Sequence, residues 1–407
     1  MTFEIALTGI NAASTQLDTI SNNIANNATF GFKGSRVEFA DVFALSSFGA
    51  SSPKVGQGVR VSNVRQEFAQ GDMQFTDRNL DLAVEGKGMF KLEDNGAEIY
   101  TRSGNFGLDL NGNIVNSSGG KLMGYGVDNN GELQPIVEPL YVDFTDLQPE
   151  PTSEIDLAMN LDIKSVVPPP FDVTDSTTFN YSTSVTVYDS LGSSQLANIY
   201  FRKDAPNTWS VYTYVDNVEV SQAGGDELTF DASGTLQAVN GTPGAVFTTN
   251  LFTPASQAED MQISFNVNDI SQFDNSFGVN RIEQNGFAAG RLEGFDIDSE
   301  GILFGRFSNG QAKTMGQLTL TSFPNQQGLR QIGSTSWMET YSSGEPATGA
   351  PGSASLGKVQ AGALEGSNVD ITSELVAMIG AQRSFQANAQ VITTGDTLTQ
   401  TVINIRR

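Results

Sequence analysis

The sequence predicts a mostly β protein whose terminal α-helices pair with each other as a coiled coil. Three observations support this fold class. Apolar residues follow a helical period at both ends of the chain. The middle carries short runs in which β-branched or aromatic residues alternate with polar ones. Glycine is abundant, with 42 in 407 residues, as expected where tight turns join many short strands. The predicted domains are therefore nested and discontinuous, with β-rich domains in the middle of the chain.

The amino-terminal helix is predicted from an apolar seam with alternating spacings of three and four residues. Its members are Phe3, Ala6, Ile10, Ala13, Leu17, Ile20 and Ile24. This is the heptad pattern of a coiled coil, and neither Gly nor Pro occurs between Gly9 and Gly31. About 25 helical residues would span roughly 37 Å.

The carboxy-terminal helix is predicted from a second apolar stripe. Its members are Ile371, Leu375, Met378, Phe385, Ala389, Ile392, Leu398, Val402 and Ile405. Asp370 is the predicted N-cap, and Glu374 lies in the first turn. Arg406 and Arg407 close the chain, where the helix dipole favours cations.

These two seams form the predicted self-assembly interface. Each helix could instead pack on its own globular core, as most amphipathic helices do. Pairing between the ends and with neighbouring subunits is favoured because both seams lie at the termini and both contain Ala, which permits close helix approach. The candidate interface residues are Phe3, Ile10, Leu17, Ile20, Ile24, Leu375, Met378, Phe385, Ala389 and Ile392.

The middle of the chain is predicted to form strands and hairpins. Alternating runs predict strands at 184–188, 198–202 and 210–215. The pattern Asp-x-x-Gly-x-apolar recurs, and it suits a hairpin turn whose glycine takes a positive φ. Its four copies begin at Asp109, Asp128, Asp231 and Asp298.

Composition divides the chain into four predicted parts. The terminal helical domain comprises 1–30 and 365–407, the linker region 31–70 and 345–364, the β-rich core domain 71–145 and 285–344, and the inserted outer β domain 146–284. The insert holds 4 Lys and Arg against 19 Asp and Glu, so it carries −15 of the net charge of −24. Such a bias predicts a domain that faces solvent.

The same composition argues against several functions. A net charge of −24 disfavours nucleic-acid binding, which needs basic patches. The chain has no Cys and no His, so disulfides, thiolate metal sites and His-based catalysis are excluded. We therefore predict that the protein is not an enzyme and uses no cofactor or metal. No window of 18 apolar residues predicts a membrane span, and the amino terminus lacks the basic and apolar regions of a cleavable signal peptide.

Two motif-like segments are predicted to be chance matches. Gly352–Lys358 has the spacing of a phosphate-binding loop, but Val359 stands where Ser or Thr must bind magnesium. Asp296, Asp298 and Glu300 match the first half of a calcium-binding loop, but Phe307 stands where a bidentate Glu is required.

Three blocks of the sequence resemble signatures of the bacterial flagellar rod and hook family. They are residues 21–33, residues 78–90 with 100–106, and residues 363–375 with 381–388. Residues 186–192 and 301–310 are similar to segments of the hook branch of this family, whose rod members are shorter.

The resemblance implies a structural subunit of the flagellar hook. It implies export without a cleavable signal peptide through the flagellar type III apparatus, and assembly outside the cell into a curved hollow tube that acts as a flexible universal joint. The implied partners are further copies of the chain, the distal rod protein, the hook cap scaffold, the hook-filament junction protein and the export apparatus. A distal rod subunit remains the alternative, followed by a secreted β-rich binding protein or adhesin.

Overall fold

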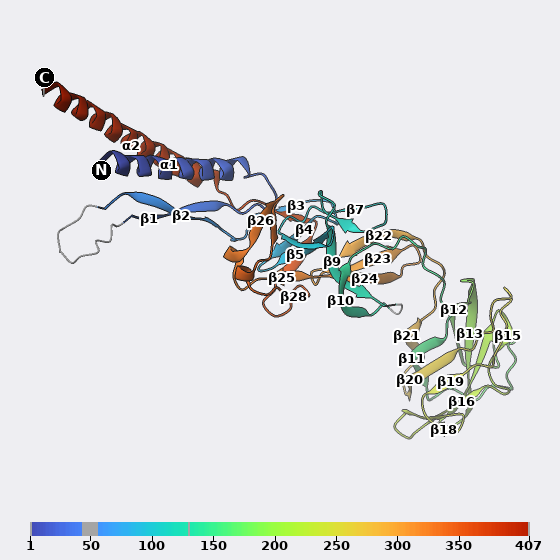
Figure 1. Cartoon of the computed structure of the whole chain (residues 1–407). Helices are drawn as coiled ribbons and strands as arrows, with labels where there is room; N and C mark the ends of the chain where they lie inside the picture. Colours follow the sequence, from blue (N-terminus) through green and yellow to red (C-terminus); the bar gives the residue numbers. More distant parts are fainter. Residues whose placement is uncertain (1, 43–55, 129–130, 406–407) are drawn as a thin grey trace. The chain divides into compact units, whose positions relative to one another are not determined.

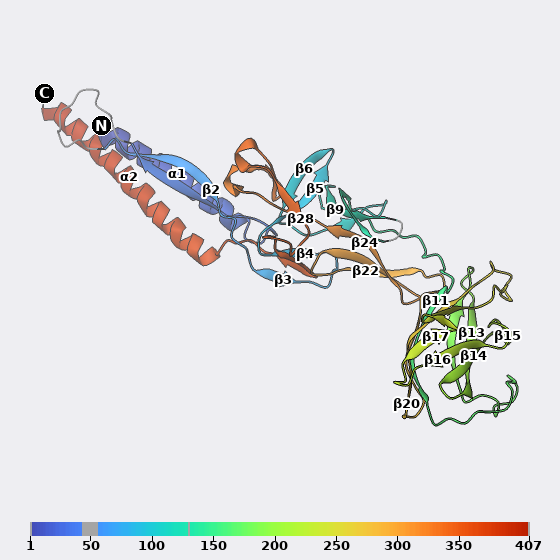
Figure 2. The ribbon, with the colours of Figure 1, turned by 90° about the horizontal axis from the view of Figure 1, so that it is seen from below.

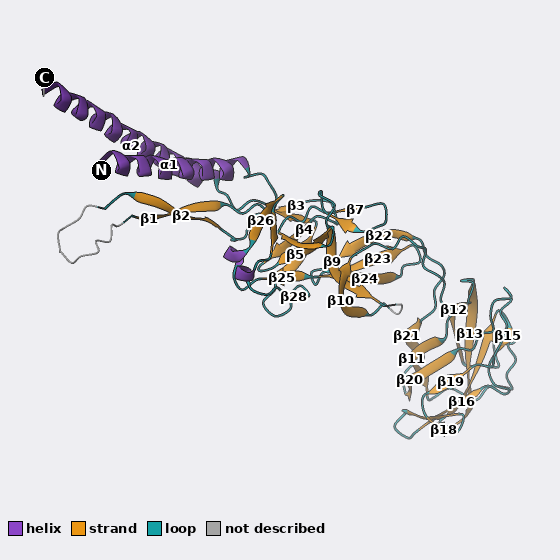
Figure 3. Cartoon of the chain, in the orientation of Figure 1, coloured by secondary structure: helices purple, strands orange, loops and turns teal. Residues whose placement is uncertain are grey.

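The chain folds into two compact units. The computed structural model describes residues 2–42, 56–128 and 131–405. The first unit comprises Met1–Phe144, Phe295–Gly305 and Lys313–Arg407, and the second comprises Thr145–Gly294 and Arg306–Ala312. Figure 1 gives the element labels, and Figure 3 shows two long terminal helices, many strands, and the loops and short helical turns that join them. The predicted fold class, mostly β with terminal helices, is confirmed.

The two terminal helices pack against each other. Helix α1 spans Thr2–Ala25 and α2 spans Ile371–Ile405. They lie side by side in two orthogonal views, with the start of α1 beside the distal half of α2, so the pair is antiparallel (Figures 1 and 2). The predicted pairing of the chain ends is confirmed. Among the described residues, neither helix combines the length and hydropathy required to cross a membrane.

Helix α2 begins where the sequence predicts. The Asp370 carboxylate accepts a hydrogen bond from the backbone N–H of Ser373 at 2.7 Å, as an N-cap does. This bond lowers the pKa of Asp370. The predicted cap is therefore confirmed.

A two-stranded hairpin follows α1 in the chain. Strands β1 (Ser35–Asp41) and β2 (Val59–Gln66) are antiparallel, with a register shift between Glu38 and Phe39. Thr8 of α1 accepts a hydrogen bond from the N–H of Val59 at 3.3 Å, so the hairpin packs against the helix. The range 31–70, predicted as a linker, contains both strands.

The β-rich part of the first unit centres on a sheet that has 13 strands among the described residues. Its main path runs β22-β23-β24-β9-β5-β6-β27-β26, with β10 and β8 beside β9, β7 beside β8, β25 beside β5 and β28 beside β25. The strands are β5 (Met89–Asp94), β6 (Ala97–Thr101), β7 (Gly107–Leu108), β8 (Ile114–Val115), β9 (Lys121–Val127), β10 (Leu133–Pro139), β22 (Leu292–Ile297), β23 (Ile302–Phe307), β24 (Ala312–Leu318), β25 (Leu320–Ser322), β26 (Arg330–Gly333), β27 (Ser336–Met338) and β28 (Ala347–Gly349). Two short 3₁₀-helices, η1 (Gln326–Gly328) and η2 (Tyr341–Ser343), lie between these late strands.

Two small ladders join the beginning of the chain to its end. Strand β3 (Met73–Phe75) pairs with β30 (Ala363–Glu365). Strand β4 (Leu82–Glu85) pairs with β29 (Lys358–Ala361). Both ladders precede α2 directly, so they hold its first turn close to the β-rich part of the unit.

The second unit is built from two sheets that enclose one apolar core. One sheet runs β19-β20-β11-β21, and the other runs β12-β13-β14-β16-β17-β18 with β15 beside β14. The strands are β11 (Glu154–Asp162), β12 (Tyr181–Tyr188), β13 (Ser194–Ala205), β14 (Thr208–Val215), β15 (Val218–Glu219), β16 (Asp226–Phe230), β17 (Leu236–Val239), β18 (Thr242–Pro243), β19 (Val246–Thr248), β20 (Ser264–Phe273) and β21 (Gly278–Gln284). Side chains from both sheets, including Leu157, Phe201, Trp209 and Phe265, are buried in the core. The three predicted strands lie inside β12, β13 and β14.

The recurring Asp-x-x-Gly pattern forms the predicted turns. In all four copies the glycine N–H donates to the Asp carbonyl at 3.0–3.1 Å, and the glycine φ lies between +76° and +82°. A fifth turn of this kind, Asp189 to Gly192, was not predicted. The Asp298 carboxylate accepts hydrogen bonds from the N–H groups of Glu300 and Ile302, which confirms that this segment is a turn.

A buried carboxyl group in the second unit gives a pH-dependent prediction. Asp226 has no exposed surface, and its Oδ2 has no hydrogen-bond partner among the described residues. Burial raises the pKa of Asp226 above its ordinary value of 3.8, so ionisation of this group favours the unfolded chain as the pH rises. We expect Asp226→Asn to raise the Tm of this unit by about 2–4 °C at pH 7. The gain should vanish below about pH 3, where Asp is protonated in both states.

Calorimetry at both pH values checks this prediction. Asp269→Asn is the matched control, because Asp269 is exposed and pairs with Arg281 at 3.1 Å on the surface, where an ion pair contributes little. A lower Tm for Asp226→Asn at pH 7 would show that the ionised carboxylate stabilises the fold.

Candidate self-assembly interface

The face that α1 buries within its own subunit carries mostly small side chains. Ala6, Ala13 and Ile20 of α1 recur every seven residues, and each is at most 5% exposed. The helices approach so closely that a Cβ on Gly9 would lie 2.6 Å from the Asn388 side chain. Ala381 of α2 is also buried. The predicted heptad seam is thus the face that α1 turns toward the rest of its own subunit.

The ten candidate interface residues fall into three groups by exposure. Ile20 is buried within the subunit. The half-buried residues are Ile10, Leu17, Ile24, Met378, Ala389 and Ile392. The exposed residues are Phe3 at 55%, Leu375 at 47% and Phe385 at 38%. The third group presents the largest share of its apolar surface for a neighbour to cover.

Helix α2 exposes further large apolar side chains that are not among the ten candidate interface residues. They are Val376, Ile379, Val391, Leu398, Val402 and Ile403, which are 49–67% exposed. Helical spacing had assigned the apolar residues of α2 to one stripe, whereas the structure places small residues against α1 and many larger ones toward solvent. So many exposed large apolar side chains on one helix indicate that α2 carries an interaction surface.

Two Asn side chains, of which Asn23 is buried and Asn368 is half-buried, link the bases of the two helices. Asn23 is 2% exposed, and its Nδ2 donates to the Ser35 carbonyl at 2.8 Å and to Glu374 Oε1 at 2.9 Å. Asn368 Oδ1 accepts from the N–H of Gly34 at 2.8 Å. Both Asn residues lie in blocks that resemble the family signatures, so these blocks have a structural role.

A buried charged triad lies beside these amides. Lys33 Nζ is 2.5 Å from Glu365 Oε1, and Arg102 Nη1 is 2.9 Å from Glu365 Oε2. All three side chains are at most 5% exposed. Lys33 also donates to the Ala69 carbonyl at 2.7 Å, and Arg102 donates to the Gly86 carbonyl at 2.6 Å. Burial lowers the pKa of Lys33, and the adjacent carboxylate opposes this shift.

The backbone at this junction is also tightly packed. Gly31 has a φ of +68°, and its N–H donates to the Glu365 carbonyl at 2.8 Å. A Cβ on Gly31 would lie 2.4 Å from the backbone nitrogen of Ser103. The three sequence blocks therefore meet at backbone distance, which no pattern within a single block could predict.

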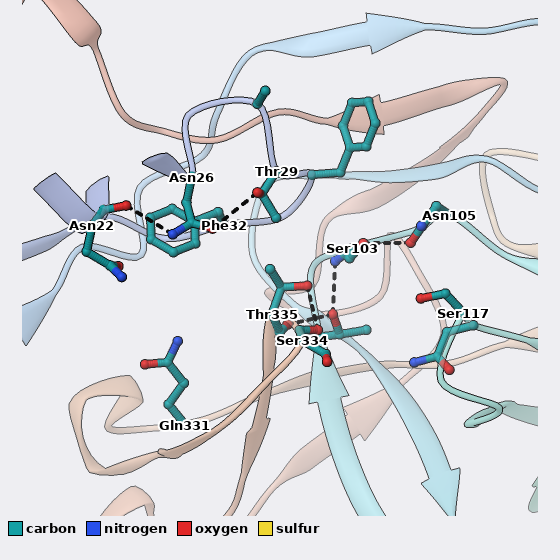
Figure 4. Close-up of a pocket in the computed structure, with 14 residues that line it drawn as sticks. Asn22, Asn26, Thr29, Phe32, Ser103, Asn105, Ser117, Gln331, Ser334 and Thr335 are labelled. Carbon is teal, nitrogen blue, oxygen red and sulfur yellow. Dashed lines mark hydrogen bonds between the residues drawn. The ribbon is translucent and has the colours of Figure 1, made fainter. Parts of the chain in front are cut away.

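A pocket of about 530 Å³ opens near the end of α1 (Figure 4). Amide and hydroxyl groups line much of it, including those of Asn22, Asn26, Ser103 and Gln331, and none of its lining residues is charged. Several of these polar groups already bond to each other; Ser103 Oγ, for example, donates to Asn105 Oδ1 at 2.7 Å. The pocket offers no acid, base or anion-binding group, so its chemistry suits contact with a polar, uncharged surface.

Four protein-family models each match a stretch of the chain. The flagella basal body rod protein model matches residues 3–33, and the flagellar basal body rod FlgEFG protein C-terminal model matches 360–405. The flagellar hook protein FlgE/F/G D1 domain model matches residues 83–163, and the flagellar basal body protein FlaE D2 domain model matches 160–287. The two terminal matches are thus to models of flagellar basal-body proteins.

Full-length relatives give the particular family. The chain is 38% identical to the flagellar hook protein FlgE of Salmonella typhimurium over 418 residues and to that of Escherichia coli over 416, covering 100% of each sequence. It is 31% identical to the FlgE of Borreliella burgdorferi, with 98% of both sequences covered. The chain belongs to the family of flagellar hook proteins, the structural subunits of the hook.

A solved structure supports the fold. The crystal structure of the Helicobacter pylori flagellar hook protein FlgE2 matches with a TM-score of 0.55 and 15% sequence identity. The match covers 70% of this chain and 99% of that one.

Proposed function

We propose that this chain assembles with copies of itself into the curved hollow tube of the flagellar hook, which couples the motor rod to the filament as a flexible universal joint. The observation that carries the proposal is the number of large apolar side chains that α2 exposes. In a chain with a net charge of −24, subunits repel one another, so association requires packed apolar surface. Residues such as Leu375, Phe385 and Leu398 supply that surface.

The ten candidate residues would then make two kinds of contact, one within a subunit and one between subunits. Ile20 and the half-buried members would hold α1 and α2 together within a subunit. Phe3, Leu375 and Phe385 would be covered by the helices of neighbouring subunits. The acidic second unit would lie toward solvent, where its charge keeps contacts between copies weak and hydrated.

The remaining parts of the proposal follow from the same family. The tube would form outside the cell after export through the flagellar type III apparatus without a cleavable signal peptide. It would grow beneath the hook cap scaffold, on the distal rod protein, and end at the hook-filament junction protein. We assign the chain no catalytic activity, because its proposed role requires only packing and mechanical coupling. The alternative, a distal rod subunit, is not favoured, because the full-length relatives are hook proteins.

Electron microscopy of purified subunits polymerised in vitro tests the proposal. We expect hollow tubes that curve, because the proposed joint has to bend. A variant truncated before Ile371 is the matched control and should form no polymer. Straight, rigid rods from the intact chain would favour the alternative, and a subunit that stays monomeric at all concentrations would overturn the proposal.

A further inference from the structure

Glu365 is the only acidic member of the buried triad, and its position within the fold is unusual. It is 0% exposed and ends β30, five residues before the N-cap of α2. Its two carboxylate oxygens contact cations from two distant parts of the chain. Lys33 follows the turn after α1, and Arg102 follows β6 of the large sheet.

We propose that Glu365 is an electrostatic clamp that couples the bases of both terminal helices to the β-rich part of the first unit. With the carboxylate present, the triad has a net charge of +1, and each cation has a charged partner. Without it, two buried cations would face each other with only carbonyl oxygens as partners. Removing one partner of a buried ion pair is strongly destabilising for this reason.

If the Glu365 carboxylate is lost, the arrangement of the triad determines which part of the first unit loses its structure. Lys33 lies in a short connection, and Glu365 lies in the two-stranded ladder β3–β30, which has three residues per strand. Arg102, in contrast, adjoins a many-stranded sheet. Repulsion between the cations is therefore relieved most readily by release of the helix bases. The large sheet would keep its structure while the helices lose their fixed attachment to it.

Charge and shape predict opposite rankings of three variants. Glu365→Gln preserves side-chain volume but leaves both cations unpaired. Lys33→Met and Arg102→Met each remove packing and hydrogen bonds but leave one balanced ion pair. If the triad is a clamp, Glu365→Gln is the most damaging of the three. If it only fills space, Glu365→Gln is the mildest.

Hydrogen exchange of the intact subunit, followed by mass spectrometry of its peptides, distinguishes these cases. In Glu365→Gln we expect amides in 31–35 and 366–374 to lose about a hundredfold of their protection, while those of β5 and β9 change less than threefold. Lys33→Met should cost about tenfold or less at the same sites. Glu67→Gln is the matched control, because Glu67 pairs with Arg36 at 3.4 Å near the junction but both side chains are more than half exposed.

The double variant Lys33→Met with Glu365→Gln completes the test. It contains one unpaired cation instead of two, so its backbone amides in 31–35 and 366–374 should be better protected from exchange than those of Glu365→Gln alone. Additive losses in the double variant, or a Glu365→Gln variant milder than both Met variants, would overturn the clamp. These measurements use the unassembled subunit, so their outcome is independent of whether the chain forms hooks.

Discussion

Leu375→Asp and Phe385→Asp subunits are expected to remain folded and soluble but to form no polymer. Both positions are more than a third exposed in the isolated subunit, so an aspartate there meets water and costs little. In the assembled tube the same carboxylate would be buried in an apolar contact without a partner. This costs about 4 kcal/mol, which raises the critical concentration for assembly roughly a thousandfold.

Two further variants isolate the cause of this loss. Gln382→Asp places the same residue on an exposed polar position of α2 and measures the effect on the helix alone. Ile20→Asp places it in the buried seam, so it should lower the Tm of the subunit itself. Sedimentation measures assembly, and calorimetry measures stability. A marked drop in Tm for Leu375→Asp would contradict the assignment of this face to contacts between subunits.

Gly31→Ala is expected to destabilise the first unit more than Gly→Ala does at a positive-φ glycine with open surroundings. The residue has a φ of +68°, where Ala costs roughly 1 kcal/mol more than Gly. Its Cβ would also lie 2.4–2.8 Å from backbone atoms of Arg102 and Ser103, which cannot rotate away. We expect a total cost of about 3 kcal/mol or more, because overpacking adds to the strain.

Gly96→Ala is the matched control for this variant. Gly96 has a φ of +84°, but nothing lies within 4 Å of its added Cβ. Only the strain of about 1 kcal/mol applies there, equivalent to a fall of roughly 2–4 °C in Tm. Thermal unfolding of both variants gives the comparison. Equal losses would show that the backbone at Gly31 yields to the extra methyl group.

Local signals predicted much of this fold correctly. Asp370 caps α2 as expected, and the Asp-x-x-Gly turns form at all four predicted positions, because caps and turns depend on residues a few positions apart. The heptad seam of α1 also identified its packed face. The pattern could not show whether the partner of that face lies in the same chain or in another. Ile20 and Phe3 belong to one seam, yet one is buried within the subunit and the other is exposed.

The junction could not be predicted in the same way. Lys33, Arg102 and Glu365 each lie in blocks that resemble family signatures, but nothing within a block reveals that its charged residue is buried. Burial of this kind depends on which distant segments meet, and the small ladders that bring them together have only three or four residues per strand. A single sequence gives no measure of such pairing.

The difference in length between the helices has a thermodynamic consequence. Helix α2 has 35 residues and α1 has 24, and because Gly9 lies beside Asn388, the last turns of α2 extend past the beginning of α1. A helical segment of about ten residues without a packing partner is marginal in water. A free subunit therefore gains little from ordering this end, and two free subunits that meet must both lose that entropy for a single contact. Addition to an existing end, where several neighbours are already ordered, avoids part of this loss, so growth should be favoured over nucleation.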